Sequence, residues 1–428
     1  MTQERYLFVS TDSHVGPSLK NHLRPYCETR YLEAFDDDLA RTEAHLAAAA
    51  SKVLSEQDPL SAAIQGGDTV AAGRLGSPTD TPAMKQRRQF AETVPGLQDP
   101  TARLSDMDAE GVAADVIFAG GQNGELLPFD TSKDATLHRL GYDIFNRWLR
   151  DYCSAAPERL IGVAQITMDD IPDAVRQVTV AAEAGFRTVN FPAPRRGLLP
   201  YTEPDYEPFW DACDDLQLTL NTHGGGGDRG YWTGPGARFA TRAEGHFFGR
   251  RALWGLIFGG VFERHPDLHF VLTEQFGSWV PTTLAELDDI YEDNLRVTTG
   301  YDRMLPRRPS EYWARQVYLA DSFMSRTEAL ARHDIGIGQI MYGTDYPHAE
   351  SIYPLTRLAL RHTFSGIDPK EVAMMLGGNA VKCFRLDEAP LRAIADRIGP
   401  TVEEVSQPTT DEELAGNVPP FCLGFRAS

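Results

Sequence analysis

Short apolar segments alternate with segments of helical periodicity along this 428-residue chain, and this alternation restricts its fold more than any other feature. The predicted strands cover residues 6–9, 114–118, 160–164, 187–191, 218–222, 269–273, 317–320 and 340–343. A helical segment precedes each strand after the first. Eight such units predict an α/β chain whose parallel strands close into a (β/α)8 barrel, the TIM barrel.

A doubly wound open sheet is the second fold that fits this alternation. That fold binds dinucleotides through a Gly-x-Gly-x-x-Gly turn after its first strand. The sequence after residue 9 contains no such turn. We therefore favour the closed barrel.

The barrel is predicted to occupy residues 1–386, with a long insertion at 17–100 and a C-terminal helical tail at 387–428. The insertion contains a predicted helix at 30–50 and a stretch rich in Gly, Ser, Thr, Asp and Pro at 58–82, which indicates a loop. Insertions of this length commonly form a lid or a subunit contact. The tail has one predicted helix at 391–398.

Composition excludes several classes of partner. A formal net charge of -20, with 42% hydrophobic and 24% charged residues, is typical of a globular protein without a basic face for nucleic acid or anionic membranes. An anionic small-molecule substrate would need local arginines, and the pairs at 195–196 and 250–251 are candidates. We favour the alternative that these are solvated loop charges.

The five cysteines are scattered and show no Cys-x-x-Cys spacing, so we expect reduced thiols and no disulfide framework. No apolar run approaches the roughly 20 residues of a membrane span, and no leader-like segment is evident. We therefore expect a cytoplasmic enzyme that acts on a small molecule, as a homodimer.

The motif Asp12-x-His14 follows the first predicted strand. Side chains two residues apart in extended backbone point to the same side, so these two are expected to converge. A carboxylate beside an imidazole is a possible pair of metal ligands. The same spacing also arises from a helix cap beside a surface histidine, so the pair alone does not establish a site.

Further polar residues stand at the ends of other predicted strands, where the active site of a (β/α)8 barrel lies. They are Asn190, His223, Glu274, Asp321 and Asp345. His223 precedes four glycines, which allow close approach of the backbone to a ligand. Glu274 ends an apolar strand, which indicates a cation or arginine nearby.

Two further histidines belong to the same prediction. His348 lies three residues after Asp345, and we expect it to contact substrate or a metal ligand. His246 lies in a segment predicted as a loop, and we include it among the candidate ligands.

Four motifs together resemble the amidohydrolase superfamily. They are Asp12-x-His14, Asn221-Thr222-His223-Gly224-Gly225, Leu272-Thr273-Glu274-Gln275 followed by Trp279-Val280-Pro281, and Gly343-Thr344-Asp345-Tyr346-Pro347-His348. The similarity runs from the first strand to about Leu386. It is greatest with the branch that includes metal-dependent decarboxylases of the aminocarboxymuconate-semialdehyde type, and that branch is also similar to a diiron monooxygenase of diterpenoid biosynthesis.

This resemblance implies a divalent metal held by His14, His223 and Asp345, with Asp12 and Glu274 nearby. The chain departs from the commonest pattern of the superfamily, which has His-x-His in place of Asp12-x-His14, a histidine in place of Glu274, and a lysine in place of Asn190. A bridging carbamylated lysine is therefore not expected. The carboxylate-rich set suits one or two ions of iron or manganese at least as well as zinc.

Two enzymatic hypotheses follow. The first is a hydrolase or decarboxylase of a small carboxylate, ester or amide, in which the metal activates water, Asp345 accepts a proton and His348 orients the substrate or the water. The second is a non-heme diiron monooxygenase that hydroxylates a bulky apolar, terpenoid-like substrate, free or CoA-linked. Its two irons would share Asp12, His14, His223, Glu274 and Asp345. A barrel that only binds is disfavoured, because the ligand set is complete.

Overall fold

Eight parallel strands form a single sheet in the computed structural model, which describes residues 4–55, 81–121, 127–224, 237–419 and 422–425. The strands are β1 (Val9–Val15), β2 (Ala114–Ala119), β3 (Leu160–Gln165), β4 (Thr188–Asn190), β5 (Thr219–His223), β6 (Phe270–Thr273), β7 (Val317–Ser322) and β8 (Ile340–Gly343). Each pairs in parallel with the next in sequence. The loop predicted at 58–82 lies almost wholly outside the described residues. Three of the four glycines that follow His223, at 225–227, also lie outside them.

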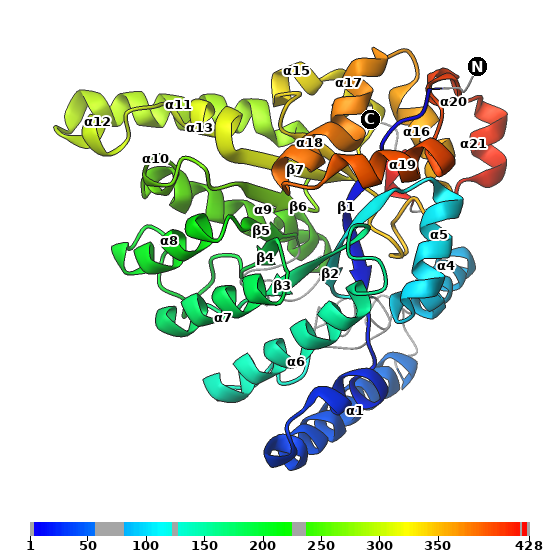
Figure 1. The fold of residues 1–428 in the computed structure, drawn as a ribbon, viewed down its shortest axis with the longest axis horizontal. Helices are drawn as coiled ribbons and strands as arrows, with labels where there is room; N and C mark the ends of the chain where they lie inside the picture. Colours follow the sequence, from blue (N-terminus) through cyan, green and yellow to red (C-terminus); the bar gives the residue numbers. More distant parts are fainter. Residues whose placement is uncertain (1–3, 56–80, 122–126, 225–236, 420–421, 426–428) are drawn as a thin grey trace.

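Hydrogen bonds between β1 and the segment after β8 bring the first and last strands together. The amide of His14 donates to the carbonyl of Tyr346 at 2.7 Å, and the amide of Asp345 donates to the carbonyl of Asp12 at 2.8 Å. Figure 1 shows the strands at the centre with helices around them. The prediction of a (β/α)8 barrel is confirmed.

The sequence pattern predicts the first strand too early in the chain. The predicted strand at 6–9 ended before the polar run that begins at Ser10, but β1 starts at Val9 and continues through that run to Val15. The hydroxyl of Thr11 donates to the carbonyl of Tyr342, and that of Ser13 to the carbonyl of Val116. Because these polar side chains find partners inside the barrel, they do not end the strand. Asp12 and His14 therefore lie within β1.

Several of the surrounding helices bury an apolar face. In α6 (Ala135–Cys153), Leu140, Ile144, Trp148 and Leu149 recur at helical spacing and are buried in the core. Helix α5 (Pro100–Glu110) starts at Pro100 and ends at Gly111, whose φ of +81° suits glycine. The remaining helices between strands are α7 (Ile171–Glu183), α8 (Glu207–Asp215), α9 (Ala237–Phe258), α10 (Val261–Arg264), α11 (Val280–Val297), α12 (Tyr301–Met304), α13 (Pro309–Gln316), α14 (Arg326–Leu330) and α15 (Arg332–Ile335).

The insertion and the tail add helices outside the barrel. The insertion contains α1 (Leu32–Ser55) and α4 (Pro82–Thr93), of which the sequence predicted only the first. After β8 come α16 (Thr356–Phe364), α17 (Pro369–Ala373) and α18 (Asn379–Cys383), and the tail contains α19 (Glu388–Ile398), α20 (Val402–Ser406) and α21 (Asp411–Asn417). Arg361 of α16 pairs with Glu413 of α21, so the tail contacts the barrel helices.

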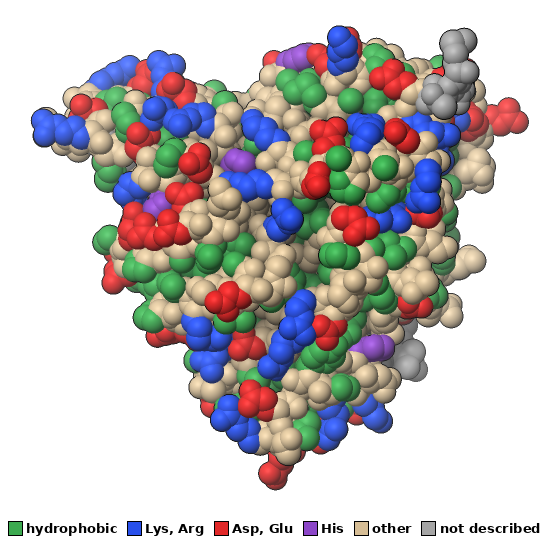
Figure 2. Space-filling model, viewed as in Figure 1, with side chains coloured by type: hydrophobic (Ala, Val, Ile, Leu, Met, Phe, Trp, Pro, Cys, Tyr) green, Lys and Arg blue, Asp and Glu red, His purple; other side chains and the backbone are tan. Residues whose placement is uncertain are grey.

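Acidic and basic side chains are interspersed over the face shown in Figure 2. Among the described residues, no helix is both long and apolar enough to span a bilayer.

A buried arginine links the helical layer to the first two strands. The guanidinium of Arg103 in α5 donates twice to Asp115 of β2, at 3.0 and 2.6 Å, and also to the carbonyl of His14 and the hydroxyl of Ser13. It lies 3.9 Å from the centre of the Tyr346 ring. Arg103 thereby supports β1 next to His14.

Replacing Arg103 with methionine should lower the free energy of unfolding by about 3–5 kcal/mol, because Asp115 would remain buried without its counter-ion. Urea denaturation followed by tryptophan fluorescence measures this change. Arg150→Met is the control, because the Arg150–Asp151 pair is exposed, and it should cost no more than about 1 kcal/mol. Equal stability of the two variants would contradict this role of Arg103.

Candidate metal centre

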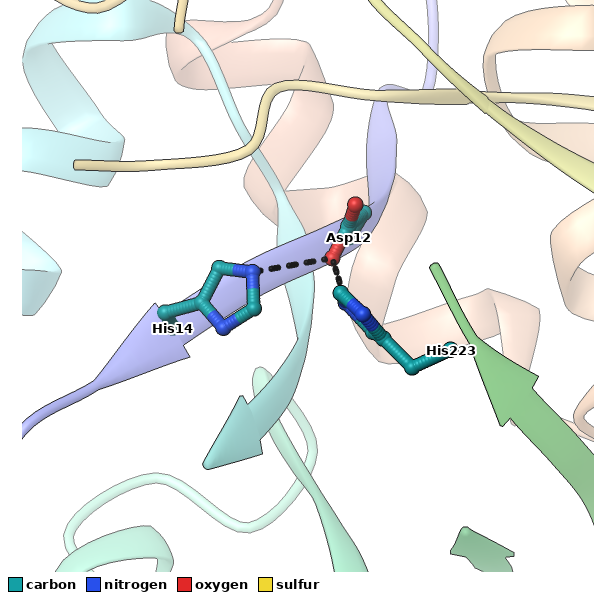
Figure 3. A group of neighbouring side chains, drawn as sticks. All are labelled: Asp12, His14 and His223. Carbon is teal, nitrogen blue, oxygen red and sulfur yellow. Dashed lines mark hydrogen bonds and ion pairs between the residues drawn. The ribbon is translucent and has the colours of Figure 1, made fainter. Parts of the chain in front are cut away.

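Three side chains from two strands meet at the carboxyl end of the barrel. In β1, His14 Nε2 lies 3.5 Å from Asp12 Oδ1, and His223 Nε2 at the end of β5 lies 3.3 Å from the same oxygen. Figure 3 shows both imidazole rings turned toward that carboxylate. Asp345, directly after β8, joins them, because its Oδ1 lies 3.0 Å from His14 Nε2. Four of the predicted metal ligands are therefore neighbours.

The hydrogen-bond network assigns the tautomers of the two histidines. His14 donates Nδ1–H to the carbonyl of Ala119 at 3.2 Å, and His223 donates Nδ1–H to the carbonyl of Gly224 at 3.0 Å. A backbone acceptor on one ring nitrogen leaves the other nitrogen free to bind a metal. Both Nε2 atoms face Asp12 Oδ1, as ligands of one ion would.

The charges in this cluster affect one another strongly. Burial, with the nearby charge of His348, holds the pKa of His14 well below its usual value. Burial also opposes ionisation of Asp12 and His223, but their mutual attraction prevails and moves the pKa of Asp12 to about 2 and that of His223 to about 9. Burial raises the pKa of Asp345 to about 7. A cation at the centre would favour the ionised carboxylates and deprotonate the imidazoles.

Buried polar atoms without partners support the fit of a metal ion. Among the described residues, His14 Nε2 and both carboxylate oxygens of Asp345 are buried and make no hydrogen bond. The unprotonated Nε2 of His14 lies 3.0 Å from Asp345 Oδ1. Two acceptor atoms this close repel one another unless they share a proton or a cation. The donor set of two imidazoles and two carboxylates suits a divalent ion.

His348 lies beside this cluster and contacts Asp345 on its other side. Its Nδ1 lies 3.0 Å from Asp345 Oδ1, its Nε2 donates to the carbonyl of Gly120 at 2.9 Å, and its ring stacks on His14 with centroids 3.9 Å apart. Burial disfavours the imidazolium, but the charge of Asp345 raises the pKa of His348 to about 10. His348 and Asp345 therefore form a buried pair whose charges attract one another.

Two acidic residues follow their strands in an unusual backbone conformation. Glu274, after β6, has φ of +53°, and Asp345 has φ of +54°. This left-handed region is unfavourable for side chains other than glycine and is often tolerated at functional sites. Burial raises the pKa of Glu274 to about 7, and its Oε2 lies 3.4 Å from His223 Nδ1.

One acidic residue near the site was missed from the sequence. Glu350, in the loop after β8, offers a carboxylate oxygen within 4.8 Å of ligand atoms on Glu274 and Asp345. A single glutamate in a loop carries no distinguishing pattern. Only its spacing of five residues from Asp345 could have drawn attention to it.

His246 does not lie in a loop, as predicted, but in helix α9. Its Nδ1 is 2.9 Å from the carbonyl oxygen of Glu274, and its ring packs near Phe276. No candidate ligand group in the described part of the chain includes His246. Its role as a ligand remains a prediction without support from this geometry.

The other polar residues that the sequence analysis singled out make different contacts. Asn190 donates to Gln165 Oε1 at 2.9 Å, and Asp321 is buried within β7. The arginines at 195 and 196 are exposed, as expected of solvated charges. Arg250 is different, because it lies in α9, donates to Gln275 Oε1 at 2.7 Å and stacks over Trp279.

Comparisons with known proteins agree with this fold. The sequence matches a family model described as amidohydrolase over residues 42–386, a range that includes His223, Glu274 and Asp345 but not Asp12 or His14. No curated protein matches the sequence significantly.

Among solved structures, a 5-carboxyvanillate decarboxylase from Sphingomonas paucimobilis has a TM-score of 0.57 and 20% identity, over 89% of this chain and 99% of that one. A 5-carboxyvanillate decarboxylase from Novosphingobium aromaticivorans with bound manganese has a TM-score of 0.64 and 18% identity, over 89% and 97%. A dihydroxybenzoic acid decarboxylase from Polaromonas, with bound manganese and 2-nitroresorcinol, has a TM-score of 0.57 and 17% identity, over 90% and 98%. At these identities the likeness concerns the fold.

Replacing His223 with alanine should weaken the affinity for Mn²⁺ by at least about 100-fold, because it removes a direct ligand from the proposed centre. Calorimetric titration of chelator-treated protein measures the affinity. His333→Ala is the control, because His333 is largely exposed and pairs with Glu371. Unchanged Mn²⁺ affinity in His223→Ala would contradict the site.

Proposed function

We propose that this chain, which belongs to the amidohydrolase family, is a manganese-dependent decarboxylase that removes CO2 from a hydroxylated aromatic carboxylate. The observation that carries this proposal is the convergence of Asp12, His14, His223 and Asp345 around buried atoms without partners, with His348 paired to Asp345. The similar structures named above are decarboxylases, and two of them contain manganese. Both facts support this choice within the wider class of metal-dependent hydrolases and decarboxylases.

The proposed ligands of the cation are His14, His223, Asp12 and Asp345. A bound divalent cation supplies a Lewis acid that attracts a carboxylate or hydroxyl oxygen of the substrate. Asp12 holds its own orientation through Oδ2, which accepts a hydrogen bond from Ser322 of β7. This contact leaves Oδ1 facing both histidines.

The His348–Asp345 pair provides the proton that decarboxylation requires. When the bond between the ring carbon and the carboxylate breaks, CO2 leaves and the electron pair stays on the ring carbon, which then takes up one proton. His348 Nδ1 and Asp345 Oδ1 lie 3.0 Å apart, beside the proposed ligand His14. The pair is therefore placed to act as the general acid.

The hydrolytic and oxygenase hypotheses predict different products. Hydrolysis of an ester or amide would use the same pair as a base toward water, and it would release no CO2. Oxygenation would consume O2. None of the similar structures named above is an oxygenase.

A direct test compares CO2 release under nitrogen and under air by protein reconstituted with Mn²⁺. The panel contains 2-hydroxybenzoate, dihydroxybenzoates and 5-carboxyvanillate, with benzoate as the substrate that lacks a hydroxyl group, and with matched aryl esters and amides. Release of CO2 from a hydroxylated member supports the proposal. Turnover confined to esters or amides, or dependent on O2, would overturn it.

Replacing Asp345 with asparagine should reduce the decarboxylation rate by at least about 1,000-fold, because both the proton pair and a metal ligand are lost. Steady-state rates, with metal content measured on the same samples, give this effect. Asp289→Asn, on the exposed face of α11, is the matched control and should retain the wild-type rate. Full activity in Asp345→Asn would exclude both the acid and the ligand role.

A further inference from the structure

A small cavity lies between helix α5, strand β2 and the segment after β8. Asp106, Glu110, Asp115, Thr344 and Tyr346 are among the residues that line it, and none of the proposed ligands of the metal centre does. Its volume is about 10 Å³, which is room for one occupant of the size of a water molecule. We propose that this cavity binds a monovalent cation, K⁺, through the carboxylates of Asp106, Glu110 and Asp115.

Asp115 presents a buried carboxylate oxygen without a partner. Its side chain is only 3% exposed. Both hydrogen bonds from the Arg103 guanidinium go to Oδ2, at 3.0 and 2.6 Å, and Oδ1 makes no hydrogen bond among the described residues. A guanidinium often pairs with both oxygens of a carboxylate through two parallel bonds. Because Arg103 uses one oxygen here, the other is left for an occupant of the cavity.

The other two carboxylates of the cavity accept hydrogen bonds from neutral groups. Asp106 Oδ2 accepts from the hydroxyl of Tyr346 at 2.5 Å, and Glu110 Oε2 accepts from the amide of Thr356 at 2.9 Å. Neutral donors leave the negative charge of a carboxylate in place. Burial raises the pKa of Glu110, and the charge of Asp106 acts in the same direction. A cation in the cavity would compensate both carboxylates.

Negative charge exceeds positive charge around the cavity. The three carboxylates carry three negative charges, and the buried guanidinium of Arg103 supplies one positive charge. Arg357 also acts on Glu110, but its guanidinium pairs with Glu404 at 2.8 Å and donates to the carbonyl of Ile398 at 2.7 Å. This excess disfavours an anion and favours a cation.

Donor chemistry and size identify the kind of ion. The polar side chains that line the cavity offer carboxylate and hydroxyl oxygens, which are ligands of hard cations. Mg²⁺ usually keeps several of its water ligands, and the cavity has no room for them. K⁺ gives up its water more readily and has about the radius of a water molecule. Both criteria therefore favour K⁺.

A bound K⁺ would support the segment that carries Asp345. Thr344 and Tyr346 precede and follow that residue, and both line the cavity. The ring of Tyr346 also stacks under the guanidinium of Arg103, so one ion would join α5, β2 and the segment after β8. Binding of K⁺ does not rest on the proposed function, because the cavity is formed by other residues.

The test measures binding of Tl⁺, an analogue of K⁺ with a similar radius, by equilibrium dialysis in nitrate buffer. The protein is first saturated with Mn²⁺, so that the metal centre does not take up Tl⁺. Wild type should bind one Tl⁺ per chain, and added K⁺ should displace it. Glu110→Gln should weaken Tl⁺ binding at least about tenfold, because it removes one of the three charges. Glu183→Gln makes the same chemical change on the exposed surface of α7 and should bind Tl⁺ as wild type does.

Each result supports or overturns the K⁺ site. No Tl⁺ binding by wild type would overturn it and leave water as the occupant of the cavity. Unchanged Tl⁺ affinity in both Glu110→Gln and Asp106→Asn would exclude the cavity as the place where the ion binds. Displacement of Tl⁺ by Mg²⁺ at lower concentration than by K⁺ would overturn the choice of a monovalent ion. Circular dichroism checks that each variant is folded, and Asp106→Asn probes the same cavity if Glu110→Gln is not. No substrate enters the measurement, so its outcome is separate from that of the decarboxylation assay.

Discussion

The hydrogen bond from the amide of Asp345 to the carbonyl of Asp12 is the contact on which the site depends. It joins the segment after β8 to β1 and thereby brings the two ends of the sheet together. The same contact carries the side chain of Asp345 to His14. Barrel closure and assembly of the proposed metal centre are therefore one event, and a chain in which β1 and β8 failed to meet would lose both.

Closure of the barrel also buries carboxylate groups whose charge a metal ion would neutralise. Asp12 and Asp345 are fully buried, and the Nε2 atoms of His14 and His223 face their carboxylate oxygens. Without a cation, protons must compensate, which explains why the pKa of Asp345 is raised while that of His223 is raised as well. A divalent ion replaces those protons and uses the same lone pairs. The buried charges of this cluster are unfavourable in a metal-free protein and are compensated when a metal ion is bound.

Segments outside the barrel complete the surroundings of the centre. Helix α4, in the insertion, and the C-terminal tail both bind the loop after His348, through Arg87 and Leu423. His348 and Glu350 both belong to the segment between β8 and α16. The insertion and the tail thus influence the site through the backbone of one loop. Substitutions in these two segments would move acidic side chains of that loop without changing the ligands on the barrel strands.

The sequence by itself determined the barrel and most of the proposed ligands, because strand and helix periodicities are local and because strand ends in a (β/α)8 fold converge by geometry. It predicted that Asp12, His14, His223 and Asp345 converge at one rim, and these side chains are neighbours in the structure. Tertiary structure alone decided that β1 continues through its polar residues, since their partners Tyr342 and Val116 are distant in sequence. It also decided that His246 belongs to a helix and that Glu350 approaches Asp345. Those outcomes depend on contacts between distant segments, which no local pattern encodes.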